Sequence, residues 1–102
     1  MRSVNLSKVV ISLDGDRLYS FEQAATLAET SVTVVEQFAA LSLIEPEGHM
    51  LRARDIARVA QVLRLRRDLG LNLVGAGMVL DMAQEIARLR AQLQAYQSSL
   101  SR

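Results

Sequence analysis

The chain has 102 residues, of which half are hydrophobic and only 4% aromatic, so it suits one small domain with an aliphatic core, with or without a helical arm. The absence of Cys excludes a disulfide framework, a cysteine-based zinc site and a thiol nucleophile. The net charge of +1 hides an asymmetry, because residues 1–50 carry three basic and seven acidic side chains, whereas residues 51–102 carry nine and four.

The chain carries no targeting or membrane signal that we recognise. Met1–Lys8 is polar and no apolar stretch follows it, so we expect no signal peptide. The longest run of apolar residues and glycine, Leu73–Leu80, is too short to span a bilayer. We therefore expect a cytoplasmic protein with no membrane segment.

The first predicted elements are a strand and a helix. Val9–Leu13 is apolar and β-branched, and a turn signal follows at Asp14–Asp16, which favours a strand with a returning piece at Arg17–Tyr19. Ser20, followed three residues later by a glutamine, forms a capping box. It predicts a helix over Phe21–Glu29.

A second short helix and a hairpin come next. Ser31 caps a helix whose apolar residues run to Leu41, and Glu45–Gly48 contains the proline and glycine that end this unit. Two short helices with so short a joint resemble a helix-turn-helix. His49–Arg52 then looks like a short hairpin, or wing.

Two further helices complete the predicted chain. The third runs over Asp55–Asp68, Gly70 ends it, and Asn72 caps a long fourth helix. We therefore predict a winged-helix-like domain over residues 1–70 and a C-terminal dimerisation helix over residues 71–102.

The fourth helix carries an apolar seam whose residues recur at alternating steps of three and four, the period of a coiled coil. The seam consists of Val79, Met82, Ile86, Leu89, Leu93, Tyr96 and Leu100. A seam this narrow needs cover from elsewhere. It either packs on its own domain or self-associates. We expect a homodimer whose interface is formed by Val79, Met82, Ile86, Leu89, Leu93 and Tyr96.

This layout resembles the MerR-type winged-helix regulators. The similarity runs through Leu43–Pro46, Asp55–Ile56 and Leu63–Gly75. It implies a mainly α fold: a MerR-like winged helix-turn-helix with a short N-terminal strand and a long C-terminal coiled-coil helix.

A more specific resemblance is to the chaperone modulators of the CbpM family, which are themselves MerR-like. It rests on the block Arg64–Leu69, on Gly75, on the seam and on Arg88–Arg90. Heat-shock repressors of the MerR class share part of this pattern. The resemblance implies a homodimer that binds and inhibits the J-domain of a DnaJ/CbpA-type co-chaperone, whose second helix is strongly basic.

The second helix departs from the MerR pattern where that family contacts DNA. MerR regulators carry an Arg-Tyr-Tyr-Glu block there, whereas this chain has Glu36–Ala39. The positions of the phosphate-contacting arginine and first tyrosine hold Glu36 and Gln37. A carboxylate facing the phosphates would be repelled, so we expect no nucleic-acid binding. An acidic surface suits a basic partner instead. The predicted partner-binding residues are Glu29, Glu36, Glu45 and Glu47.

No enzymatic chemistry is visible in the sequence. His49 has no nucleophile or carboxylate arranged beside it, and the chain has no Gly-rich phosphate loop and no metal-ligand spacing. We therefore expect no enzyme, no cofactor and no small-molecule substrate. Two functions remain open: a chaperone modulator that binds a J-domain, and a heat-shock-repressor-like MerR regulator that binds DNA.

Overall fold

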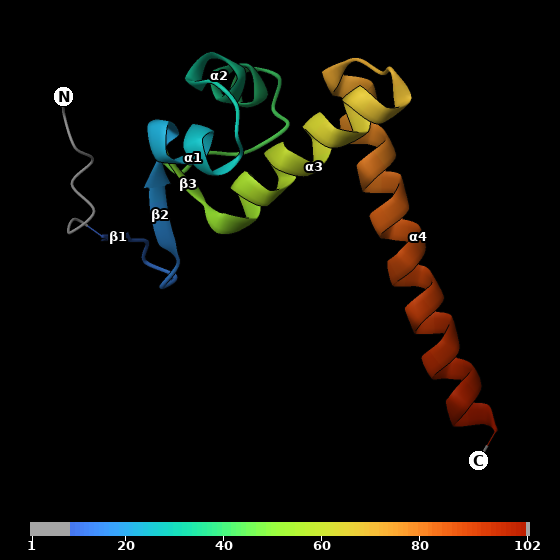
Figure 1. Ribbon diagram of the computed structural model, residues 1–102. Helices are drawn as coiled ribbons and strands as arrows, with labels where there is room; N and C mark the ends of the chain where they lie inside the picture. The colour runs from blue at the N-terminus through green and yellow to red at the C-terminus, as the bar shows by residue number, and fades with distance from the viewer. Residues whose placement is uncertain (1–8, 102) are drawn as a thin grey trace. The chain divides into compact units, whose positions relative to one another are not determined.

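The computed structural model describes residues 9–101 and has a mainly helical fold with one small sheet (Figure 1). Its elements are β1 (Val10–Ile11), β2 (Arg17–Ser20), α1 (Phe21–Leu27), α2 (Val32–Ala40), β3 (Met50–Arg52), α3 (Ala53–Leu69) and α4 (Leu73–Leu100). The predicted fold class is confirmed. The chain divides into two compact units, of which one ends at Gln61 and the other begins at Val62. This division falls within α3, whereas the sequence placed it at residue 70.

The sheet is antiparallel in the order β1-β2-β3. Leu18 of β2 lies in register with Val10 on one side and Arg52 on the other. The Ser12 N–H donates to the Asp16 carbonyl at 2.8 Å and closes the turn between β1 and β2. Both predicted strands are confirmed, although β1 is only two residues long.

Helix α1 begins as the sequence predicts. The Gln23 N–H donates to Ser20 Oγ at 3.0 Å, and the Ser20 N–H donates to Gln23 Oε1 at 2.8 Å. These two bonds satisfy donors that the first turn of a helix leaves unpaired, so the capping box is confirmed. Helix α2 also has its predicted cap, because the Val34 N–H donates to Ser31 Oγ at 3.2 Å.

Helix α2 ends one residue earlier than the sequence indicates. Its apolar residues were expected to run to Leu41, but its last residue is Ala40 and Leu41 is the C-cap. Ser42 takes a left-handed conformation with φ +59°, and the Leu43 N–H donates to the Phe38 carbonyl at 2.9 Å. This arrangement is a Schellman motif, which ends a helix. The left-handed position of this motif is usually occupied by glycine. Glu29, with φ +58°, ends α1 in the same way.

The left-handed Ser42 gives a stability prediction. We expect Ser42→Gly to raise the free energy of unfolding by about 0.5–1 kcal/mol, since glycine removes a steric penalty that exceeds its own entropy cost. Ala40→Gly is the matched control, and this change inside α2 should lower stability by a similar amount. Urea denaturation measures both. Lower stability of Ser42→Gly would contradict the account of how α2 ends.

The core of the first unit is aliphatic apart from one ring. Val35, Phe38, Leu51 and Val59 have no exposed surface, so α2, β3 and α3 all contribute to it. The remaining buried apolar residues of this unit are Leu18, Ala24, Ala25, Ile44 and Ile56. Because one face of α2 packs into this core, the other face of α2 is exposed to solvent.

The second unit contains the end of α3 and all of α4. Gly70 has φ +68° and follows the last residue of α3, as predicted. Asn72 caps α4, because its Oδ1 accepts the Gly75 N–H at 2.7 Å. A Cβ at position 75 would lie only 3.2 Å from that oxygen, so glycine there leaves room for the cap. Within residues 9–101 no helix combines the length and the apolar character needed to cross a membrane.

Candidate partner-binding surfaces

Helix α2 presents a polar face to solvent. Val35 and Phe38 anchor its inner side, and every third or fourth residue on the other side is exposed. The exposed residues are Thr33, Glu36, Gln37 and Ala40, with Leu41 at the C-cap. This is the helix that would face the major groove in a DNA-binding helix-turn-helix.

The stretch from Leu18 to Leu51 has a single sign of charge. It contains no Lys or Arg. Its ionised side chains are Glu22, Glu29, Glu36, Glu45 and Glu47, all of them exposed. This set includes the four predicted partner-binding residues. Glu22 lies in the first turn of α1 and was not in the prediction.

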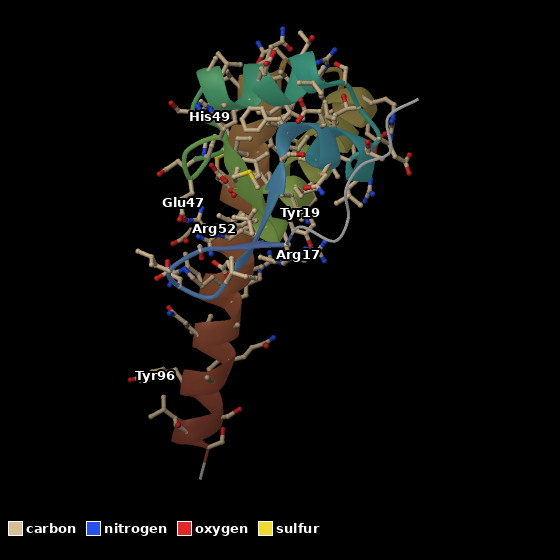
Figure 2. All side chains as sticks on the ribbon, turned by 90° about the vertical axis from the view of Figure 1, so that its left-hand side faces the viewer. Arg17, Tyr19, Glu47, His49, Arg52 and Tyr96 are labelled. Atoms are coloured by element: carbon tan, nitrogen blue, oxygen red, sulfur yellow. The ribbon has the colours of Figure 1, made fainter. Side chains whose placement is uncertain are left out.

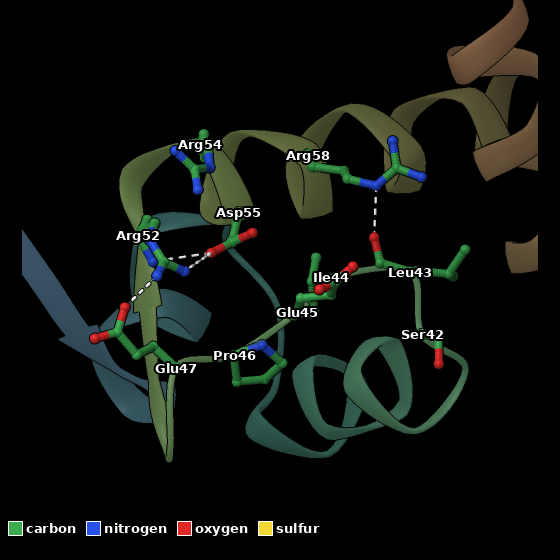
Figure 3. Close-up of a pocket in the computed structure, with 10 residues that line it drawn as sticks. All are labelled: Ser42, Leu43, Ile44, Glu45, Pro46, Glu47, Arg52, Arg54, Asp55 and Arg58. Atoms are coloured by element: carbon green, nitrogen blue, oxygen red, sulfur yellow. Dashed lines mark hydrogen bonds and ion pairs between the residues drawn. The ribbon is translucent and has the colours of Figure 1, made fainter. Parts of the chain in front are cut away.

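Glu47 differs from the other glutamates because its carboxylate is an ion-pair partner of Arg52 (Figures 2 and 3). The Arg52 side chain is only 15% exposed, and its Nε lies 3.4 Å from Asp16 Oδ2. Its NH1 lies 4.0 Å from Asp55, whose Oδ2 also accepts the Arg52 backbone N–H at 3.0 Å. Arg52 therefore links the β1–β2 turn, the wing and the start of α3.

The wing itself is a tight hairpin. Glu47 and Met50 exchange backbone hydrogen bonds of 2.9 and 3.1 Å, and Gly48, with φ +64°, makes the turn. A hairpin is therefore present, but its turn lies at Glu47–Met50, earlier than the predicted His49–Arg52, of which Met50–Arg52 form one strand. Its outgoing strand, β3, pairs with β2 and so joins the wing to the sheet. His49 is exposed at the tip.

A hollow of about 600 Å³ lies between the loop after α2 and the start of α3 (Figure 3). Its ionisable lining residues are Glu45, Glu47, Arg52, Arg54, Asp55 and Arg58. Arg58 donates its Nε–H to the Leu43 carbonyl at 2.6 Å, and Arg52 is held by carboxylates. Three cations against three carboxylates leave no net charge to hold an anion. In the described part of the chain no group of three or more His, Cys, Asp or Glu is placed to bind a metal.

The cations that flank the acidic stretch are engaged within the protein. Arg17 lies over the Tyr19 ring, 4.9 Å from its centroid, and Arg52 is paired with carboxylates (Figure 2). Arg54 is 73% exposed and lies 3.8 Å from Asp16. Arg52 is thus largely withdrawn from solvent, whereas Arg17 and Arg54 remain exposed.

Helix α4 presents the second surface. All of its residues from Asp81 to Leu100 are exposed, including six seam residues that are 49–67% exposed. Val79 is half-buried and thus differs from the rest of the seam. Met78, 59% exposed, was not part of the predicted seam. The step of four from Met78 to Met82 continues the apolar stripe toward the start of α4.

The charges at the end of α3 and on α4 belong to exposed side chains. Arg64, Arg66 and Arg67 are all exposed, and Arg67 Nε lies 3.9 Å from Asp68 Oδ1. On α4, Arg88 pairs with Glu85, one turn earlier, and this carboxylate raises the pKa of the Arg88 guanidinium. Pairs this exposed contribute little stability.

The fold and its surfaces define a small winged helix-turn-helix protein with an exposed apolar helical arm. Residues 19–97 match the family described as "MerR HTH family regulatory protein". The chain belongs to this MerR family. The resemblance to the superfamily is therefore confirmed, and the family is a regulatory one rather than a class of enzymes.

A relative in Streptomyces coelicolor (strain ATCC BAA-471 / A3(2) / M145) bears the name "Putative heat shock protein HspR". It is 30% identical to this chain over an alignment of 79 residues that covers 72% of this chain and 52% of the relative. The chain thus spans about half the length of that protein. No solved structure matches the chain. Both matches support a MerR-family regulator, and neither shows a chaperone modulator.

Proposed function

We propose that this chain is a non-enzymatic chaperone modulator that, as a homodimer, binds and inhibits the J-domain of a DnaJ/CbpA-type co-chaperone. The observation that carries the proposal is the charge of the helix-turn-helix. From Leu18 to Leu51 it has five exposed glutamates and no Lys or Arg. Action on a DnaJ-type partner would place the protein in the cytoplasm.

The acidic helix-turn-helix argues against DNA as the partner. Duplex DNA carries a negative charge about every 1.7 Å along its axis, and proteins bind it by replacing counterions with Lys and Arg. Here the outer face of α2 offers Glu36 instead, and the flanking Arg17 and Arg52 are engaged with Tyr19 and with carboxylates. Electrostatic attraction to DNA would therefore be weak at α2, the helix that reads DNA in a DNA-binding helix-turn-helix.

The same surface suits a basic protein helix. Complementary charge speeds the encounter of two proteins and rejects partners of the wrong sign. A J-domain whose second helix is strongly basic, the partner implied by the resemblance to CbpM, supplies that charge. Inhibition then follows from occupation of that helix, which would no longer be available to another protein.

The homodimer in this proposal rests on α4. A helix whose residues 81–100 are all exposed has no intramolecular packing to stabilise it there, and isolated helices are marginally stable in water. Its apolar residues keep the coiled-coil period from Met82 to Leu100. A second copy of the chain carries the matching seam.

The runner-up is a DNA-binding MerR regulator, favoured by the family match and by the name of the HspR relative. Its DNA contacts would come from the wing and from the third helix, α3, on which Arg54 is 73% exposed. Selection from random duplexes at low salt decides between the two functions. We expect no enriched sequence, whereas a palindromic site bound with nanomolar affinity would replace our proposal with the regulator.

A further inference from the structure

Beyond its charge, the exposed face of α2 has an apolar end. Ala40 and Leu41 follow Glu36 and Gln37 by one helical turn, so the polar face ends in a methyl group and a leucine side chain. Leu41 is 48% exposed even though it lies directly beside the core residues of α2. Glu45 follows four residues later, in the loop that lines the hollow.

The backbone holds Leu41 in one conformation. Its N–H donates to the Gln37 carbonyl at 2.9 Å, and the next residue is the left-handed Ser42. The Leu43 N–H then returns to the carbonyl of the fully buried Phe38. Because hydrogen bonds hold this backbone, only the rotamers of the Leu41 side chain have to be ordered when a partner docks.

We infer that Leu41, together with Ala40, is the apolar anchor of the partner-binding surface, and that Glu36 and Glu45 flank it. The occupant is an amphipathic helix that packs an apolar residue on Leu41 and places Lys or Arg toward the two carboxylates. This inference rests on the proposed function, since it names the contacts by which the acidic surface would hold a basic helix.

Charge alone would give a different kinetic behaviour from an anchored surface. Exposed charges chiefly raise the association rate, whereas a desolvated apolar contact at the centre of an interface chiefly slows dissociation. The two contributions therefore separate in a kinetic experiment. Glu36 and Glu45 set the rate of encounter, and Leu41 sets the lifetime of the complex.

The test compares Leu41→Ala with Leu27→Ala. Leu27 is an equally large side chain, 59% exposed, at the end of α1. Surface plasmon resonance is run with two probes, an isolated DnaJ-type J-domain and a synthetic amphipathic peptide of Lys and Leu, after circular dichroism has checked that each variant folds. We expect Leu41→Ala to raise the dissociation rate about tenfold with an unchanged association rate, and Leu27→Ala to match the wild type.

The two probes distinguish a failure of the Leu41 anchor from a failure of the proposed function. If Leu41→Ala dissociates from both probes at the wild-type rate, or if Leu27→Ala has the same effect, the anchor is wrong and the proposed function stands. If the wild type binds only the peptide and Leu41→Ala weakens that binding, the anchor stands and the J-domain proposal fails. Binding of neither probe overturns both.

Discussion

Replacing Ile86 and Leu89 by Asp is expected to convert the proposed homodimer into a monomer, the largest effect that we predict. Both side chains lie in the middle of the seam and are about half exposed in a single chain. Burying a large apolar side chain contributes about 1.5–3 kcal/mol, whereas burying an unpaired carboxylate is strongly unfavourable. Analytical ultracentrifugation should therefore show a single species of monomer mass for the double variant.

The matched control places the same two charges on the other side of α4. Gln84 and Ala91 are exposed and each lies two residues beyond a seam position. Gln84→Asp/Ala91→Asp should therefore remain dimeric. A wild-type protein that sediments as a monomer at high micromolar concentration would show that the seam does not self-associate.

Reversing Glu36 and Glu45 to Lys together is expected to slow association with a DnaJ-type J-domain at low salt by about tenfold or more. The wild-type rate should fall as salt is added, because screening acts over about 8 Å at physiological ionic strength. The double variant should show a flatter salt dependence. Stopped-flow measurements across a salt series would record both quantities.

Asp14→Lys/Asp68→Lys is the control for net charge. It changes the charge by the same amount at exposed positions outside α1 and α2. It should leave most of the association rate intact. If the Glu36→Lys/Glu45→Lys variant binds at the wild-type rate at every salt concentration, the acidic face only aids solubility. The contacts must then be sought on α3 and α4, around Arg64 to Asp81.

The elements that the sequence predicted well are those whose signals are local. The cap of α1 depends on Ser20 and Gln23, three residues apart, and the caps of α2 and α4 depend on one side chain each. The end of α2 escaped prediction for the opposite reason. Ser42 takes the conformation that glycine usually takes, so the sequence carries no signal where the helix stops.

The candidate site was only partly predictable, because tertiary contacts decide which of its charged side chains form ion pairs within the protein. The sequence grouped Glu47 with Glu29, Glu36 and Glu45 as equivalent carboxylates. The hairpin brings Glu47 to Arg52 of β3, and the two side chains form an ion pair within the protein. Sequence periodicity likewise placed Val79 in the seam, although it is half-buried in the single chain.

The exposure of Leu41 is another feature that the sequence pattern does not predict. The sequence placed Leu41 among the apolar residues of the second helix. Because α2 ends at Ala40, Leu41 is the C-cap and nearly half of its surface remains exposed. Its exposure, which makes it a candidate anchor, could not be predicted from the apolar pattern.

We propose above all that this helix-turn-helix recognises a basic protein helix. Isothermal titration of the purified chain with the isolated J-domain of the DnaJ-type protein from its own organism tests it most directly. We predict a saturable complex with one J-domain per chain, whose affinity falls as salt is raised. The absence of any complex with a Kd below about 100 μM at low salt would contradict the claim.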